Sequence, residues 1–590
     1  MSNRNRPIPP GTATGHGRVR PLVLSVLCAS MTLALTIGIV LEFQDYISQS
    51  IVGPYQWLLV GLFTILTAWI SANFCLSVIG AVSLAISRRS RAPYSDRVVG
   101  GRLAVAIPIY EEDPDAVEAG LDRMFASLSA ESRLYGFHLF ILSDTRSDAK
   151  VEREIAVCRR LRRKYDAADR IFYRQRKDNR GRKAGNIQDF VETWGGAYEF
   201  ALILDADSRM DGPTVQRLAD ELDADPKLAL VQTWVRPVRG TTPFGRMQQF
   251  ATSVYGQASA EGVRLLMGDS ATYWGHNAMI RMAAFAECCG LAALPGNAPL
   301  GGEILSHDFV EAAMLHRGGW SVKVVADRLG SFEEPPPSLL AHAARDRRWC
   351  QGNLQHMQLL VADGIGWTNR LHFFMGALAY LASPIWMLFL IAGAVGLLAR
   401  APAMAALSGV APVSLPPIVD ANPWLLVAVS LGMLFLPKII GTVLVLTDGP
   451  LRRGHGGVFP LLGSMLAEMV FSTLSAPVMM LLHTRFVVEI LAGSSSGWKP
   501  GQRTGEQAAL GEVLRAHGMH MVVGVLAAIA IGWASLEALA IASPVIAGLV
   551  LSAPLTLAGS SPALGAAMRR ARLFLIPEEV HPPKVLTDGG

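Results

Sequence analysis

Two stretches near the beginning of the chain contain no charged residue, Pro21–Leu41 and Trp57–Ser87. An α-helix rises about 1.5 Å per residue, so about 20 apolar residues are enough to cross the hydrocarbon core of a bilayer. A cleaved signal peptide is the alternative for the first stretch, but its apolar run is too long and no small-residue cleavage site follows it. We therefore predict two membrane-spanning helices within residues 21–87.

Charged residues around these stretches predict their orientation. Residues 1–20 contain arginines and no acid, and further arginines follow the second stretch at 88–91. The intervening segment 42–56 contains two acids and no lysine or arginine. Because positively charged loops stay on the cytoplasmic side of a membrane, we expect the N-terminus and the residues after the second stretch to be cytosolic.

The composition indicates a chain that is part membrane-bound and part aqueous. Of its 590 residues, 51% are hydrophobic and 17% are charged, with a mean hydropathy of +0.33. Residues 88–370 have the composition of a cytosolic domain, and apolar character returns over 371–560. We predict six to eight crossings in total and a cytosolic C-terminal tail at 561–590.

The second apolar region contains segments of different kinds. His372–Ala399 and Trp424–Leu446 are clear spans, and 519–539 and 540–559 are typical of a helical hairpin. Segment 460–491 is apolar but includes several ionisable residues. This mixture favours an interfacial or re-entrant helix over a simple span. The ionisable residues of that segment are Glu468, His483, Arg485 and Glu489.

Between the two apolar regions, strand-like segments alternate with helix-like segments, which predicts parallel strands covered by helices. The expected strands are Arg102–Tyr110, Phe137–Asp144, Arg170–Arg176, Tyr198–Asp207 and Leu228–Val235. In open α/β sheets ligands bind outside the carboxyl ends of the strands. Polar side chains fall at such ends, and we expect them to share one site. They are Tyr110, Asp144, Asp205 and Asp207.

Asp205 and Asp207 follow a buried strand and are separated only by an alanine. Residues two apart in an extended segment point the same way, so both carboxylates can face one ligand. Two such oxygen ligands suit Mg²⁺ or Mn²⁺, with diphosphate oxygens and water completing an octahedron. The alternative is that Asp207 and Ser208 only cap the following helix. The neighbouring acidic strand ends favour the metal site.

Two further motifs each contain one candidate functional side chain. In RKDNRGRKAGNI, Lys183 lies at a basic turn and could meet a phosphate or a sugar hydroxyl, although a solvated basic loop is the alternative. In ILSHDFVEAAMLHRGGW, Asp308 lies at the start of a helix. An acid there could act as a general base toward an acceptor hydroxyl or could be only a helix N-cap.

The motif RDRRWCQGN combines guanidinium groups with an indole. Arg345 and Arg348 are one helical turn apart, and Trp349 is adjacent. Guanidinium groups suit diphosphate oxygens, and an indole face suits the apolar face of a sugar. A membrane-proximal basic helix is the alternative for this motif alone.

In combination, these motifs resemble the processive family 2 glycosyltransferases of the cellulose synthase type. The ordered set is an acid ending the second strand, Lys-Ala-Gly-Asn, Asp-Ala-Asp, a helix-start Asp and R-x-x-R-W. Within that family, IPIYEEDP, LSDTRSD, RKAGNI, GHNAMIR, SHDFVE and RRWCQGNLQH are similar to the membrane glucosyltransferases that make osmoregulated periplasmic glucans. The resemblance covers residues 20–560. It implies an α/β GT-A-type glycosyltransferase domain with a Rossmann-like sheet, inserted in a polytopic helical membrane domain.

The resemblance also implies roles for the matching residues. Those implied to bind the nucleotide sugar are Pro108, Tyr110, Glu112, Asp144, Lys183, Arg345 and Arg348. Asp205 and Asp207 are implied to bind the diphosphate through Mg²⁺ or Mn²⁺, and Asp308 is implied to be the general base. The residues implied to contact the acceptor are Trp349, His276 and Asn277.

This chain departs from the cellulose synthase pattern at two positions. Ser306-His307-Asp308 stands in place of T-E-D, and Arg345 occupies the Gln position of Q-x-x-R-W. The base and the Arg-Trp pair are retained, so the expected difference is in the acceptor environment. The loop over 493–517 lies where cellulose-type enzymes carry a gating loop, with an ordinary inter-helix loop as the alternative. Its candidate contacts to nucleotide are Trp498, Lys499 and Arg503.

The expected function is inverting transfer of glucose from UDP-glucose to a growing glucan at the bacterial inner membrane, with the bundle conducting the product. The resemblance implies a β-1,2 backbone, a periplasmic companion protein and acyl carrier protein. The net charge of +5 is explained by basic cytosolic loops, so we expect no nucleic-acid partner. The alternatives are another polysaccharide synthase, a non-processive lipid glycosyltransferase and a transporter with a nucleotide-sensing domain.

Overall fold

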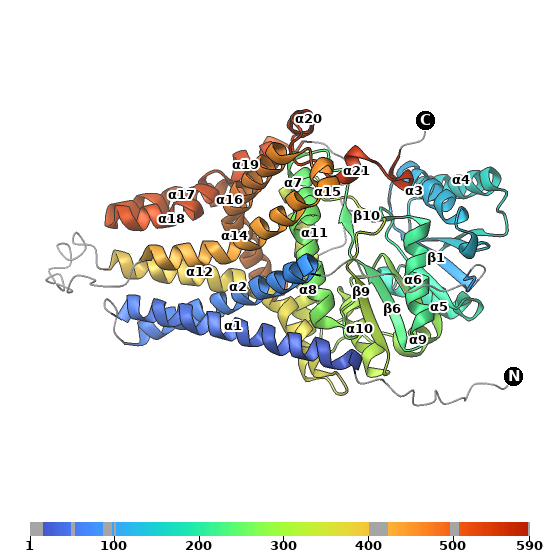
Figure 1. Ribbon diagram of the computed structural model, residues 1–590, viewed down its shortest axis with the longest axis horizontal. Helices are drawn as coiled ribbons and strands as arrows, with labels where there is room; N and C mark the ends of the chain where they lie inside the picture. Colours follow the sequence, from blue (N-terminus) through green and yellow to red (C-terminus); the bar gives the residue numbers. More distant parts are fainter. Residues whose placement is uncertain are drawn as a thin grey trace.

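The computed structural model describes residues 16–48, 53–86, 97–99, 102–399, 423–495 and 507–587. The molecule is elongated, with long helices side by side in one half and an α/β domain in the other (Figure 1). The last helices return the chain toward the α/β domain, where the C-terminus lies.

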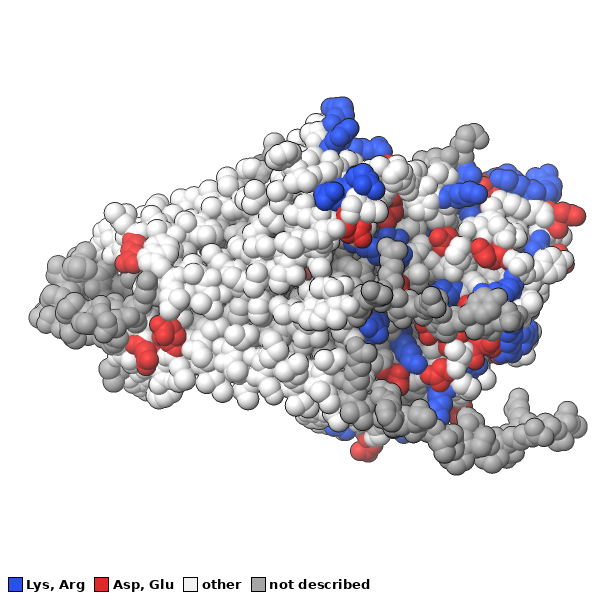
Figure 2. All heavy atoms as spheres, viewed as in Figure 1, with Lys and Arg blue, Asp and Glu red and all other residues white. Residues whose placement is uncertain are grey.

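Six helices among the described residues are long and apolar enough to span a membrane. They are α1 (His16–Ser48, apolar from Pro21), α2 (Pro54–Ile86), α12 (Trp367–Leu398), α14 (Pro423–Thr447), α16 (Val458–Leu491) and α17 (Leu510–Ala534). A seventh candidate is a pair bent by 55°, α18 (Leu536–Val550) with α19 (Ser552–Gly559). Figure 2 shows that the visible surface of this half is almost uncharged, whereas basic and acidic side chains crowd the α/β half. The surface of the helical half is therefore suited to contact with lipid.

The segment 460–491 differs from its prediction as an interfacial or re-entrant helix. It lies in one continuous helix, α16, of 34 residues. Two of its ionisable groups are paired with neighbouring helices: Lys438 of α14 donates to both oxygens of Glu468 at 2.9 Å, and His483 lies 2.6 Å from Asp346. Because pairing lowers the cost of polar groups inside a bilayer, a span is an alternative to the predicted interfacial or re-entrant helix.

The final hairpin begins and turns at other residues than predicted, and it ends at Gly559 as predicted. α17 ends at Ala534, and the hydroxyl of Ser535 caps α18 by accepting from the backbone N–H of Ala538 at 3.2 Å. Residues 510–517 of the predicted gating loop therefore belong to α17. The three residues singled out in that loop lie outside the described residues, namely Trp498, Lys499 and Arg503.

A seven-stranded sheet forms the centre of the α/β domain, in the order β3-β2-β1-β4-β8-β6-β9. Its strands are β1 (Leu103–Ile109), β2 (His138–Ser143), β3 (Ile171–Gln175), β4 (Phe200–Ile203), β6 (Leu228–Thr233), β8 (Ala278–Arg281) and β9 (Ser321–Val325). All five predicted strands are present. The sheet is nevertheless mixed, because β8 runs antiparallel to both β4 and β6. Strands β1, β2, β4 and β6 are buried on both faces, which is why they read as short continuous apolar runs.

Helices cover both faces of this sheet. One apolar core joins the sheet to α3 (Pro114–Ser129), α4 (Asp148–Tyr165) and α6 (Gly212–Ala224). A second core joins it to α5 (Arg182–Trp194), α9 (Met282–Cys288) and α10 (His307–Arg317). Short 3₁₀ turns complete the domain at η2 (Ser132–Leu134) and η3 (Gly195–Ala197). The predicted α/β layering is therefore confirmed.

A second layer of elements lies between the sheet and the membrane helices. A small sheet has the order β5 (Arg209–Met210), β10 (Ser331–Glu333), β7 (Arg236–Pro237). The helices of this layer are α7 (Pro243–Ala251), the π-helix η4 (Thr252–Gly256), α8 (Gln257–Met267), α11 (Leu339–Gln355), η5 (His356–Val361) and α15 (Gly449–Gly454).

Helices α8 and α2 cross at backbone contact. A Cβ added to Gly80 of α2 would lie 1.9 Å from the carbonyl oxygen of Ala258, and one added to Gly262 of α8 would lie 2.3 Å from that of Leu76. Only glycine permits this approach at either position, as in other helix pairs that meet through small residues. The α/β domain is thereby attached directly to a membrane helix.

The segment predicted as a cytosolic tail, 561–590, packs against the α/β domain over the part that the structure describes. It contains α20 (Pro562–Arg570), α21 (Pro577–Val580) and η6 (Lys584–Leu586). Phe574, Ile576 and Val585 are buried, and the last two belong to the core of the sheet. Glu579 pairs with Arg246, which is almost fully buried, at 2.7 Å. These residues are part of the folded domain.

Candidate active site

The predicted strand-end residues meet at one edge of the main sheet. Parallel pairing continues past the strand ends, because the backbone N–H of Asp144 donates to Ile109 at 2.9 Å and that of Leu204 donates to Ala106 at 3.1 Å. The chain ends of β2, β1 and β4 are thus neighbours, and the D-x-D segment follows β4 directly. Pro108 lies within β1, opposite Leu142.

Asp144 is held by an arginine from the basic loop. Arg176 donates to both of its carboxylate oxygens at 2.8 Å, and both side chains are largely buried. The same guanidinium donates to the carbonyl oxygens of Arg180 and Arg182 at 3.0 Å. The basic loop is therefore fixed against the strand edge, and it is not the freely solvated loop considered as an alternative. The sequence marks Arg176 only as the first residue of the RKDNRGRKAGNI motif.

The turn after β1 is closed by acidic side chains. The backbone N–H of Tyr110 donates to the carboxylate of Glu112. Glu111 adopts a positive φ of 59° and accepts hydrogen bonds from the backbone of Arg146 and Ser147 at 2.9 and 3.0 Å. Burial raises the pKa of Glu111, but these bonds and a nearby lysine outweigh burial and hold that pKa below its ordinary value. Glu111 joins the first two turns of the site.

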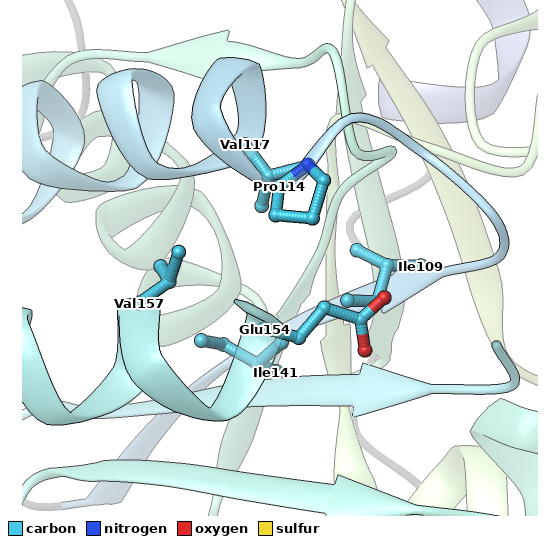
Figure 3. Close-up of a pocket in the computed structure, with 6 residues that line it drawn as sticks. All are labelled: Ile109, Pro114, Val117, Ile141, Glu154 and Val157. Atoms are coloured by element: carbon cyan, nitrogen blue, oxygen red, sulfur yellow. The ribbon is translucent and has the colours of Figure 1, made fainter. Parts of the chain in front are cut away.

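A buried glutamate of α4 holds the end of β2 through hydrogen bonds. Glu154 of α4 accepts hydrogen bonds from the hydroxyls of Ser143, Thr145 and Tyr173 at 2.7, 2.6 and 2.9 Å. Figure 3 shows its carboxylate pointing toward Ile109 beside a small cavity whose other lining is apolar. That cavity has room for about one water molecule, so it is a packing feature under the strand edge and not a ligand site.

Three motifs converge on Lys183. Its ammonium group donates to the carboxylate of Asp205 and, at 2.7 Å, to the backbone oxygen of Gly275. Gly275 has a φ of +85°, and a Cβ there would lie 3.1 Å from a carboxylate oxygen of Asp308. Lysine, D-x-D carboxylate and helix-start aspartate are therefore grouped around one glycine.

The D-x-D segment does not cap the following helix. The N-cap of α6 is Asp211, whose side chain accepts from the backbone N–H of Thr214 at 3.0 Å. Ser208 instead accepts from the backbone N–H of Asp205 at 3.0 Å and shapes the loop between them. The capping alternative for Asp207 and Ser208 is therefore wrong.

Asp308 lies within the first turn of α10, after the N-cap position at Ser306. Burial raises the pKa of its carboxyl, and Glu311 adds to the rise, while His307 and Lys183 oppose it. His307 lies 2.9 Å from Glu311. Burial lowers the pKa of His307, but the charge and hydrogen bond of Glu311 outweigh burial and raise it. The histidine that departs from the family motif therefore holds a proton more tightly than a free imidazole does, beside Asp308.

Helix α11 forms the opposite side of the site. The guanidinium of Arg345 lies 4.9 Å from the ring centre of Trp349, whose side chain is partly exposed. Burial lowers the pKa of Arg348 to about 10, with Arg345 adding to the decrease and the charge of Asp205 opposing it. Arg348 is therefore close enough to Asp205 for their charges to interact. Gly352 fits this helix against Ser306, because a Cβ there would lie 2.2 Å from the serine hydroxyl.

The two predicted acceptor residues on the loop before β8 are placed differently. Asn277 is fully buried and donates to Ser331 at 2.8 Å, so its side chain joins β8 to β10. His276 lies 3.7 Å from the carboxylate of Glu333, a residue that sequence reasoning missed. Burial raises the pKa of Glu333, and the two D-x-D carboxylates add to the rise while His276 and Arg345 oppose it. Glu333 thus faces the same site from β10.

The D-x-D carboxylates fit a divalent cation that shares its ligands with a substrate. Among the residues that the structure describes, no three His, Cys, Asp or Glu side chains are grouped to hold a metal ion. Asp205 and Asp207 supply hard oxygen ligands, and the side chain of Asp205 is 38% exposed. Mg²⁺ and Mn²⁺ commonly take one or two carboxylates and complete their shell with phosphate oxygens and water.

Comparison with known families identifies the chain. The family described as "Glycosyl transferase family 2" matches residues 104–289, and "Glycosyl transferase family group 2" matches residues 200–436. "Glucans biosynthesis glucosyltransferase H" of Caulobacter vibrioides is 39% identical over 90% of this chain and 80% of its own length. The chain belongs to this glycosyltransferase 2 family. Its α/β domain is accordingly a GT-A-type domain.

Other members of the glucosyltransferase H group show the same extent of similarity. The Vibrio cholerae protein is 39% identical over 90% of this chain and 74% of its own length. The Shewanella baltica protein is 38% identical over 94% and 76%. Among solved structures, mannosyltransferase PcManGT from Pyrobaculum calidifontis is 18% identical with a TM-score of 0.38, covering 65% of this chain and 98% of its own. The family assignment therefore depends on the sequence relatives.

Proposed function

We propose that this protein transfers glucose from UDP-glucose to the end of a growing glucan, with inversion at the anomeric carbon. The sequence relatives named for glucan biosynthesis support the product class. The convergence of Lys183, Asp205 and Asp308 around Gly275 carries the proposal, since it brings a diphosphate site and a general base to one point. This pairing is what a transfer between a nucleotide sugar and a hydroxyl requires.

Asp308 acts as the base in this proposal. Its carboxylate takes the proton from the acceptor hydroxyl as that oxygen attacks the anomeric carbon and the bond to UDP breaks. Burial raises the pKa of this carboxyl, which makes it a better proton acceptor than an exposed aspartate. His307 opposes part of this rise in the pKa and so favours the carboxylate form of Asp308 before the reaction.

Cationic groups stabilise the leaving diphosphate, whose negative charge grows in the transition state. Arg348 and Lys183 lie beside Asp205 and supply fixed positive charge there. A divalent cation held by Asp205 and Asp207 would supply further charge neutralisation when bound. Trp349, exposed at the edge of α11, offers an apolar face to the terminal acceptor glucose.

The proposal also includes a cellular location for this reaction. In our proposal the α/β domain is cytosolic in the bacterial inner membrane, the enzyme is processive, and the bundle conducts a β-1,2-linked product to the periplasm. Support comes from the basic segments that flank the first two helices and from the long apolar helices beside the site. The periplasmic companion and acyl carrier protein implied by the resemblance stay predictions.

The test uses inner-membrane vesicles containing the full-length chain, supplied with labelled UDP-glucose and Mg²⁺ or Mn²⁺. We expect a labelled glucan sensitive to β-1,2-specific digestion, no product after chelation, and accumulation on the side opposite the nucleotide. The Asp308→Asn variant is the matched control, because it retains the side-chain volume and removes the base. Equal product from that variant, or UDP-glucose binding without transfer, would contradict the proposal.

A further inference from the structure

Helix α11 presents alternating residues to the candidate site and to the membrane helices. Arg345, Arg348 and Trp349 belong to the site. Between them, Asp346 and Arg347 contact other helices. The same turn of helix therefore connects the reacting centre with the membrane half.

Asp346 is buried among polar groups of two membrane helices. One of its carboxylate oxygens accepts from the Tyr380 hydroxyl of α12 at 3.0 Å, and the other lies 2.6 Å from Nε2 of His483 in α16. The second nitrogen of His483 lies 3.2 Å from the hydroxyl of Ser383 in α12. On α11 itself, His342 lies 3.9 Å from Asp346. Three helices therefore meet at one carboxylate.

This carboxylate is charged. Burial raises the pKa of Asp346, but the hydrogen bond from His483 and the neighbouring polar groups outweigh burial and leave the pKa below its ordinary value. A buried charged group, even when hydrogen-bonded, adds little net stability compared with apolar side chains of the same volume. Its best-supported use is to select one register of packing over others.

The neighbours of Asp346 make that selection strict. Adjacent residues on a helix are about 100° apart, so a rotation by one residue would turn Arg345 or Arg347 toward Tyr380 and His483. An arginine in that position would leave Tyr380 and His483 without the carboxylate that they bind. Arg347 adds a second attachment, because it donates to Glu489 at 3.4 Å and to the backbone oxygen of Ser494 at 2.9 Å.

We propose that Asp346 is a positioning residue for glucosyl transfer, and that its bonds to His483 and Tyr380 fix the rotation of α11 so that Arg345, Arg348 and Trp349 face the site. The role rests on the proposed function. Arg345 and Arg348 act on the diphosphate most strongly as its charge grows in the transition state, whereas the strand edge holds the nucleotide before reaction, so loss of these bonds acts more on turnover than on nucleotide affinity.

The test measures UDP release and UDP binding with full-length protein in phospholipid nanodiscs. Displacing reacting groups by about 1 Å costs about a hundredfold, so we expect Asp346→Asn and His483→Leu to lower kcat by about tenfold or more. The dissociation constant for UDP should rise by a smaller factor than kcat falls, with one site per folded protein. His483→Gln retains an amide donor for Asp346 and should recover kcat to within about threefold of the unmodified protein.

Thr484→Val is the matched control, because Thr484 adjoins His483 on α16, is buried and donates to the backbone oxygen of Met480 within its own helix at 2.7 Å. It should leave kcat unchanged. The double variant Asp346→Asn with His483→Leu should lose no more than the more impaired single variant, since both changes break one interaction.

The possible failures are distinct. A native protein that neither releases UDP nor elongates a glucan overturns the proposed function and the role of Asp346 with it. A native protein that turns over, with His483→Leu retaining at least half of its kcat, overturns the positioning role alone. A parallel loss of UDP binding and kcat in both single variants, or additive losses in the double variant, would show general damage and would also overturn the role.

Discussion

The two walls of the candidate site are held in place by different parts of the molecule. The strand-edge wall, formed by the ends of β1, β2 and β4, is fixed within the α/β domain by Arg176 on Asp144 and by the hydroxyls on Glu154. The helical wall is formed by α10, which packs on the sheet, and by α11, which is fixed from outside that domain through Tyr380 and His483. Nucleotide recognition at the strand edge should therefore depend little on the membrane helices, whereas turnover should depend on them.

The largest expected effect lies on the helical wall. Asp308→Asn should lower kcat by about 10²- to 10⁴-fold, because the acceptor hydroxyl loses its base. UDP affinity should not change, since the strand-edge wall is intact. Calorimetric UDP titration beside a UDP-release assay measures both quantities. A variant that loses affinity and turnover together would contradict the separation of the walls.

The second effect lies on the strand-edge wall and should have the opposite pattern. Arg176→Gln removes two charged hydrogen bonds from Asp144 and frees the basic loop, so KM for UDP-glucose should rise about ten- to a hundredfold. At saturating donor, kcat should stay within about threefold. Arg180→Gln is the control, because Arg180 contributes its backbone oxygen and not its side chain to this contact. An unchanged KM would mean that Asp144 does not shape the donor site.

The third prediction concerns the C-terminal segment, which packs against the α/β domain and belongs to neither wall. Glu579→Gln leaves the nearly buried guanidinium of Arg246 without its charged partner, and breaking such a pair costs about 3–5 kcal/mol. The melting temperature of the purified protein should fall, while UDP affinity of the folded fraction should be unchanged. His581→Gln, a change in the adjoining exposed part of the segment, is the control. Equal melting temperatures would show that the segment is not integral to the domain.

The smallest effect is a shift in pH dependence on the helical wall. The base is active only when deprotonated, and burial raises the pKa of Asp308, so kcat should fall on acidification at a higher pH than for an exposed aspartate. The charge of His307 opposes that rise. His307→Gln should therefore move the acidic limb of the kcat profile to still higher pH. A shift toward lower pH would contradict the assigned electrostatics.

Features coded by short stretches of sequence were predictable. Asp144, Asp205 and Asp207 end apolar runs, and a short apolar run that ends in an acid indicates the edge of a buried parallel sheet. Membrane helices were equally accessible, because an uncharged run of about 20 residues has few other folded forms. The direction of β8 was not accessible, since an antiparallel strand in the middle of such a sheet has the same apolar pattern as its neighbours.

Contacts between distant segments could not be predicted. His483 was one of the ionisable residues that suggested an interfacial helix. Its partner, Asp346, lies 137 residues away, so their pairing could not be foreseen. Glu333 and Arg176 carry no motif of their own, and their places in the site depend on how β10 and the basic loop fold back. Phe574 and Ile576 are too few to indicate a core by periodicity, so 561–590 resembled a tail. The catalytic motifs are short stretches of sequence, whereas the residues that hold them in place come from distant parts of the chain.

The crossing of α2 and α8 through Gly80 and Gly262 has a mechanical consequence. Two helices in backbone contact cannot tilt or slide past each other without collision, so this junction is the stiff joint between the two halves. Helix α11 meets its neighbours through side chains, which change rotamer without moving the backbone. Any movement between the α/β domain and the membrane helices should therefore be smallest at the α2–α8 junction.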